Sequence, residues 1–159
     1  MASVAAQTAV DNIEHVILAD YVGVGVGGMF GALPRYVDAV HGSYVHLLAD
    51  DDVLASRLSV EELELAARDL GNPEVLLVDV IKGGNRYPRQ TEPRCGSIDL
   101  GCIVTRLDVW RSHVTDYGLR YEGDFDFARA LWDSGRHFER AELLFMKGDI
   151  RRGAPEVAV

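Results

Sequence analysis

The segment YVHLLADDDVLASR (Tyr44–Arg57) joins an apolar, strand-like run to three adjacent carboxylates, Asp50, Asp51 and Asp52. Two unit charges 4 Å apart repel by about 4 kcal/mol at an effective dielectric constant near 20. Either open solvent or a bound cation can offset that repulsion. The triplet therefore predicts a solvated loop or a metal site at the end of a buried strand.

Apolar runs and helical segments alternate along the rest of the chain. Buried strands are predicted where the sequence is continuously apolar: Glu14–Val22, Ser43–Ala49, Glu74–Gly84 and His137–Gly148. The clearest helices are predicted over Ser59–Asn72 and Asp124–Gly135, and each ends at a glycine-containing turn. This pattern favours an α/β fold with a mostly parallel sheet and helices on both faces. We expect a single domain over residues 1–159, with a frayed tail from about residue 150.

The composition restricts the possible partners and cellular location. The chain has 159 residues, 48% of them hydrophobic, and a formal net charge of −9. A negative surface argues against binding to nucleic acid or to anionic membranes, but not against one nucleotide in a local pocket. No run approaches the roughly 20 apolar residues of a membrane helix, and the N-terminus lacks a signal-peptide pattern. The two cysteines, Cys95 and Cys102, lack zinc-site spacing, and we expect a reducing cytoplasm.

Two further interpretations of the acidic triplet are alternatives to a metal site. Gly23, Gly25 and Gly28 spell GxGxxG after a predicted strand, and the triplet follows about 20 residues later, as in NAD-binding Rossmann domains. Pro34 interrupts the helix that this fold requires. A phosphorylated receiver domain would use Asp79 as its acceptor, but its acidic strand should open the domain.

Three segments together resemble family-two glycosyltransferases of the GT-A fold. GSYVHLLADDDVL resembles the strand that runs into the family's DxD-type metal motif, and SVAAQT…NIEHVILAD resembles the helix and strand before it. RYEGDFDFARALWDSG resembles the later segment in which acidic residues open a helix that ends in glycine. The resemblance spans about residues 3–146, in the family's order. It implies transfer of a sugar from a nucleoside diphosphate donor, most simply a UDP-sugar, to a hydroxyl acceptor with inversion.

The resemblance also implies roles for individual residues. Asp20 matches the residue that contacts the nucleotide base, and Asp50 the acid that contacts ribose or metal. Asp51 matches the metal-ligating acid and Asp52 closes the motif, so that the three would hold Mn²⁺ or Mg²⁺. Asp124 matches the catalytic base, although an acid at this position also fits a helix N-terminus without any catalytic role. Arg86, Arg89 and Arg94 are candidate phosphate or acceptor contacts in a loop over Gly83–Gly96, and solvated charges would explain them equally well.

The resemblance begins inside the family's first helix, so that the usual first strand is not matched. This departure predicts an exposed sheet edge that a second copy of the chain could cover, and hence a homo-oligomer. It also leaves open a catalytically degenerate GT-A domain that acts by binding or by self-association.

Overall fold

The structure is a computed structural model that describes residues 2–19 and 21–148. The predicted frayed tail and Asp20 lie outside the described residues. The helices are α1 (Ala2–Ala5), α2 (Gly25–Ala32), α3 (Ser59–Asp69), α4 (Leu107–His113) and α5 (Gly123–Asp133). Short 3₁₀ helices are η1 (Val10–Asn12), η2 (Leu33–Ala39), η3 (Leu100–Cys102) and η4 (Val114–Asp116). The strands are β1 (Tyr44–His46), β2 (Val53–Leu54), β3 (Val75–Lys82), β4 (Asn85–Tyr87), β5 (Ile103–Arg106) and β6 (Phe138–Lys147).

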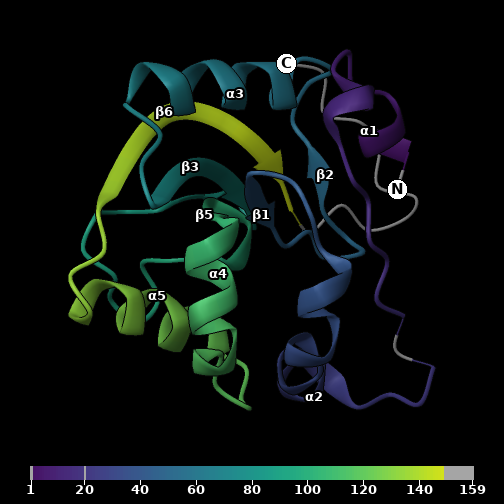
Figure 1. The fold of residues 1–159 in the computed structure, drawn as a ribbon, viewed down its shortest axis with the longest axis vertical. Helices are drawn as coiled ribbons and strands as arrows, with labels where there is room; N and C mark the ends of the chain where they lie inside the picture. The colour runs from purple at the N-terminus through teal and green to yellow at the C-terminus, as the bar shows by residue number, and fades with distance from the viewer. Residues whose placement is uncertain (1, 20, 149–159) are drawn as a thin grey trace.

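The strands form one sheet in the order β1-β5-β3-β6-β2, and β4 forms a hairpin with β3. Strand β3 lies at the centre, antiparallel to β5 and parallel to β6. Its residues Val75–Val80 are completely buried, because helices cover both faces of the sheet. Figure 1 shows α3 on one side of the curved sheet and α4 and α5 on the other.

The predicted α/β class is confirmed, and the predicted parallel sheet is confirmed only in part. The adjacent pair β3–β6 is parallel, whereas the other four pairings are antiparallel. Strands β1 and β3 both run antiparallel to β5, so that β1, β3 and β6 point in the same direction. The sheet is therefore mixed. A continuous apolar run indicates a strand that is buried on both faces of the sheet. This burial does not depend on the direction of the neighbouring strand.

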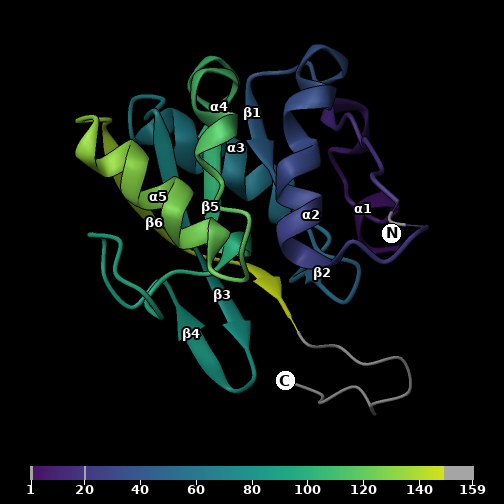
Figure 2. The same cartoon turned by 90° about the horizontal axis from the view of Figure 1, so that it is seen from below.

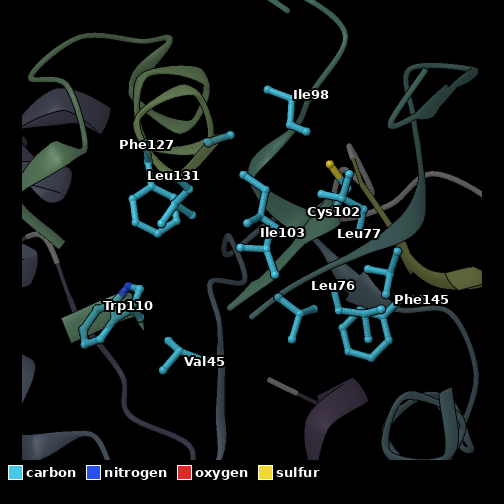
Figure 3. Packing of buried hydrophobic residues seen from close by; sticks show 14 of the residues in the cluster. Val45, Leu76, Leu77, Ile98, Cys102, Ile103, Trp110, Phe127, Leu131 and Phe145 are labelled. Carbon is cyan, nitrogen blue, oxygen red and sulfur yellow. The ribbon is translucent and has the colours of Figure 1, made fainter. Parts of the chain in front are cut away.

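The hydrophobic core lies on both faces of β3 and β5. In Figure 2, α4 and α5 lie in front of the sheet and the β3–β4 hairpin projects away from it. Figure 3 shows Phe127 and Leu131 of α5 facing Ile103, with Leu76 and Phe145 on the other side. All five side chains are at most 3% exposed. Burial of one such side chain stabilises the fold by about 1.5–3 kcal/mol.

The predicted buried strand over Glu14–Val22 is wrong for its described residues. Residues 13–19 have no regular secondary structure, and Ile17 and Val22 are 56% and 85% exposed. Leu18 packs against the core, but no described strand pairs with this segment. A strand depends on a neighbour for its backbone hydrogen bonds, which the apolar composition alone cannot supply.

The glycine segment Gly23–Gly28 is largely helical, because α2 begins within it at Gly25. A Cβ atom on Gly27 would lie 2.4 Å from the Leu119 carbonyl oxygen, so glycine permits a close approach of two backbone segments. No described strand precedes the glycines. The Rossmann interpretation, which needs a strand, a tight glycine turn and then a helix, therefore lacks its first element.

Candidate functional site

The acidic triplet and Asp124 lie at one end of the sheet. Because β1, β3 and β6 run in the same direction, the loop after β1, Lys82 at the end of β3 and Gly148 after β6 share that end. Asp99 comes just before η3 and β5, and β5 runs the opposite way, so it belongs to the same end. Ligands of open α/β sheets bind outside the carboxyl ends of the strands.

The structure separates the three adjacent aspartates. Asp50 and Asp51 are exposed in a turn, whereas the side chain of Asp52 is only 3% exposed. Asp52 Oδ1 lies 3.7 Å from Lys82 Nζ. A Cβ atom on Gly148 would lie 2.5 Å from the same oxygen, so Asp52 is packed closely on that side. The predicted triplet is therefore two solvent-facing acids and one buried acid in an ion pair.

Lys82 connects Asp52 to a carboxylate that is far away in sequence. Its Nζ lies 3.9 Å from Asp99 Oδ2. The backbone N–H of Gly101 donates to Asp99 Oδ1 at 3.0 Å, which caps η3. The thiol of Cys102 donates to the Asp99 carbonyl oxygen at 2.8 Å. These bonds hold Asp99 in place beside the lysine.

Asp124 lies in the first turn of α5, and its carboxyl group has a shifted pKa. Burial raises its pKa to about 6, and the negative charge of Asp99 adds to the increase. Backbone N–H groups of Phe125, at 2.8 Å from Oδ1, and of Leu100 act in the opposite direction. A carboxylate whose pKa is close to neutral pH can accept a proton from a hydroxyl group in general-base catalysis.

The start of α5 is held by close packing. A Cβ atom on Gly123 would lie 2.4 Å from the Gly118 carbonyl oxygen and 2.5 Å from the Phe30 ring. The Tyr117 ring stacks on Phe30 at a centroid distance of 5.1 Å and on Phe127 at 4.0 Å. Only glycine fits directly before Asp124, and the packing fixes the position of that carboxylate.

His46, at the end of β1, borders the same region. Its Nε2–H donates to the Gly101 carbonyl oxygen at 2.9 Å, and its ring meets Phe145 edge to face at 4.9 Å. Burial lowers the pKa of His46, so the ring is neutral at pH 7. The histidine therefore supports η3 next to Asp99 as a hydrogen-bond donor, without adding charge.

Two further aspartates, Asp126 and Asp79, have structural partners. Asp126 pairs with Arg120, whose Nε lies 2.8 Å from Asp126 Oδ2. Asp79 is fully buried between Arg86 and Arg140, and this burial removes the exposed acceptor that a receiver domain needs.

The other loop arginines also have partners, and neither cysteine is in a disulfide. Arg89 lies over the Tyr87 ring and Arg94 pairs with Glu92. Cys95 and Cys102 are both free thiols.

The described residues fit a divalent metal only through the exposed part of the triplet. No described group of three or more His, Cys, Asp or Glu side chains is arranged to hold a metal ion. Mg²⁺, however, commonly binds to one or two carboxylates and completes its shell with water and substrate phosphates. Asp50 and Asp51 are available for that role, whereas Asp52 is engaged with Lys82.

Sequence reasoning did not identify Lys82 and Asp99 as parts of this site. Lys82 ends an apolar strand, and Asp99 precedes a glycine and a second strand. Their positions at strand ends were a usable signal, because strand ends at one edge of a sheet lie close together. Their pairing with each other and with Asp52 depends on the order of the strands, which the sequence does not display.

Comparisons with known proteins support the fold. No family model matches the chain, and no curated protein matches it in sequence. A crystal structure of S. aureus TarS, residues 1–349, superposes with a TM-score of 0.58 at 11% sequence identity. The match covers 79% of this chain and 40% of that one, so this chain spans about two fifths of the TarS fragment. At this identity the likeness shows a GT-A-like fold alone.

The described part of the chain contains no helix with the length and apolar content needed to span a bilayer.

Proposed function

We propose that the protein transfers a sugar from a nucleoside diphosphate donor, most simply a UDP-sugar, to a hydroxyl acceptor. The observation that carries this proposal is Asp124, a carboxyl group with a pKa of about 6 at the functional end of a GT-A-like sheet. TarS, whose fold is similar, is a glycosyltransferase. The fold supports the general class of reaction, and the position and pKa of Asp124 support its proposed role as the residue that would take the proton.

In this reaction the acceptor oxygen attacks the anomeric carbon of the donor sugar. A new bond forms between the acceptor oxygen and the anomeric carbon, while the bond from that carbon to the diphosphate breaks. The electron pair leaves with the diphosphate, and Asp124 takes the proton of the attacking hydroxyl. A single displacement of this kind inverts the configuration at the anomeric carbon.

The donor is proposed to bind outside the carboxyl ends of β1 and β3. Asp50 and Asp51 would hold Mn²⁺ or Mg²⁺, which favour carboxylate oxygens and would stabilise the charge of the leaving diphosphate as Lewis acids. The contact of Asp20 with the nucleotide base remains a prediction from the family resemblance, because Asp20 lies outside the described residues.

A calorimetric titration with UDP tests donor recognition before any acceptor is known. UDP should bind more tightly with Mn²⁺ than with EDTA, whereas NAD should not bind in either condition. Mn²⁺ should also raise the melting temperature, and Asp51→Ala should remove this shift, because a ligand stabilises only the state that binds it. Asp133→Asn, on the exposed end of α5, is the matched control. Tight binding of NAD without metal would replace the proposal with the dinucleotide interpretation.

A second candidate function is self-association of a GT-A-like domain without catalysis. Strand β1 pairs with β5 on one side, and no described strand pairs with its other edge. Ile17, Tyr21 and Val22, in the segment that was predicted to be a strand, are also highly exposed. A second copy is the proposed occupant of this region. Sedimentation at tens of micromolar should show a dimer, and a strict monomer would exclude this function.

A further inference from the structure

Asp52 is the one member of the acidic triplet whose surroundings already contain a cation. Its carboxylate is almost completely buried, and Lys82 Nζ lies 3.7 Å from Oδ1. The same ammonium group lies 3.9 Å from Asp99 Oδ2. Asp50 and Asp51, by contrast, are exposed. The buried member of the triplet, Asp52, therefore faces a lysine, whereas the other two face solvent.

We propose that Lys82 is the built-in cation of this site, so that Asp52 serves as its counter-ion and is not a ligand for a divalent metal. A metal at the acidic loop then has two protein carboxylates, Asp50 and Asp51. The inference concerns the same site as the proposed function, but its test needs neither a sugar donor nor turnover.

The electrostatics of the strand ends require a positive charge at this place. Asp52 and Asp99 flank the lysine, and the charge of Asp99 also reaches Asp124. A buried carboxylate without a compensating charge is strongly destabilising. Lys82 supplies that charge permanently from the end of β3, whereas a metal would supply it only when bound.

The residue type suits this function. The chain has 16 basic residues, and only Lys82 and Lys147 are lysines. A lysine carries a compact point charge on a flexible chain, whereas arginine presents a wide planar fork. A compact ammonium can sit between two carboxylates that approach it from different loops. A closely packed neighbour, Gly148, leaves no room for a side chain on that side of Asp52.

Mn²⁺ binding to the protein without nucleotide, measured by electron paramagnetic resonance, tests the proposal. Lys82→Met should free Asp52 and raise the Mn²⁺ affinity by about tenfold or more, because metal affinity follows the number of charged ligands. Lys82→Arg keeps the charge and should leave the affinity within about threefold of the wild type. Circular dichroism of each variant reports whether the fold is intact.

The double variant Asp52→Asn/Lys82→Met separates a counter-ion from a ligand. It has the same net charge as the wild type and removes both members of the Asp52–Lys82 pair, while Asp99 loses the lysine in both Lys82→Met proteins, so that the two differ only at Asp52. If Asp52 is only the partner of Lys82, the Mn²⁺ affinity should stay within about threefold of the wild type. A loss of tenfold or more in the double variant, or a folded Lys82→Met protein with no gain, would overturn the proposal. If Lys82→Met does not fold, the double variant decides alone.

Discussion

Asp52 and Asp124 are two carboxyl groups at the same end of the sheet. The surroundings of Asp52 stabilise a negative charge, whereas those of Asp124 disfavour it. Asp52 is buried beside a lysine, whose ammonium lies 3.7 Å from its carboxylate. Asp124 is half-buried, no basic residue is among the causes that shift its pKa, and the nearby Asp99 repels its charge. The first environment compensates a negative charge, and the second favours taking up a proton. The residue type alone therefore does not show which aspartate can act as a general base; the surroundings of the carboxyl group are also needed.

The largest expected effect comes from removing the proton acceptor at Asp124. Asp124→Asn keeps the size and most of the hydrogen-bonding geometry, but an amide does not act as a base. We expect turnover of the sugar donor to fall by about 100- to 10,000-fold. UDP affinity in the presence of Mn²⁺ should change little. Near-normal turnover of Asp124→Asn would mean that Asp124 is not the proton acceptor, despite the difference between its environment and that of Asp52.

The next effect concerns the packing that positions Asp124. Gly123→Ala places a Cβ atom against the Gly118 carbonyl oxygen and the Phe30 ring. Overpacking of this kind costs about 1–3 kcal/mol of unfolding free energy. Gly101→Ala is the matched comparison, since the closest contacts of its Cβ would be the end of the Met146 side chain and not the backbone. Denaturant unfolding should show the larger loss for Gly123→Ala, and equal losses would argue against a rigid start of α5.

The pH dependence of stability provides a third comparison. The pKa of Asp124 is about 6 in the folded protein, above its ordinary value of 3.8, so its charge destabilises the folded state as the pH rises through 6. Asp124→Asn should therefore stabilise the protein by about 1–3 kcal/mol at pH 7.5, with a smaller gain at pH 4.5. Asp99, Cys102 and Tyr117 are the titratable groups that interact with Asp124.

The control for this measurement is Asp133→Asn at the exposed end of α5, paired with Arg129. It should show no stabilisation at pH 7.5. A loss of stability in Asp124→Asn at pH 7.5 would instead indicate a purely structural role for this acid at the helix start.

The smallest effect should come from Asp99→Asn. The charge of Asp99 raises the pKa of Asp124 less than burial does. Removing this charge should lower the apparent pKa of the acidic limb of the pH–rate profile by less than about one unit, and one unit is equivalent to ~1.4 kcal/mol. An unchanged limb would show that the two carboxylates do not communicate, and an upward shift would reverse the assigned sign.

The sequence was sufficient for the elements that bury apolar residues against several neighbours. Strand β3 and helices α3 and α5 were predicted because their apolar positions follow the period of the element or run without interruption. The prediction over Glu14–Val22 failed because an apolar run still needs a neighbouring strand. Gly27 lies within the glycine pattern that suggested a dinucleotide site, but the structure requires a glycine there because the Leu119 backbone approaches α2 closely. The roles of Asp50, Asp51 and Asp124 stay predictions from the sequence, whereas the Lys82 pairings depend on long-range contacts that the sequence does not display.

The parallel pairing of β3 and β6 has a consequence for the order of folding during synthesis. β3 ends at Lys82 and β6 begins at Phe138, so α4, α5 and β5 are translated before the two strands can meet. Until β6 is made, one edge of the most buried strand has no partner, and unpaired apolar edges promote aggregation. Parallel pairs with such sequence separation form slowly, because the intervening chain must be ordered first. Nascent chains that stall before Phe138 are therefore expected to depend on chaperones more strongly than chains that extend past Lys147.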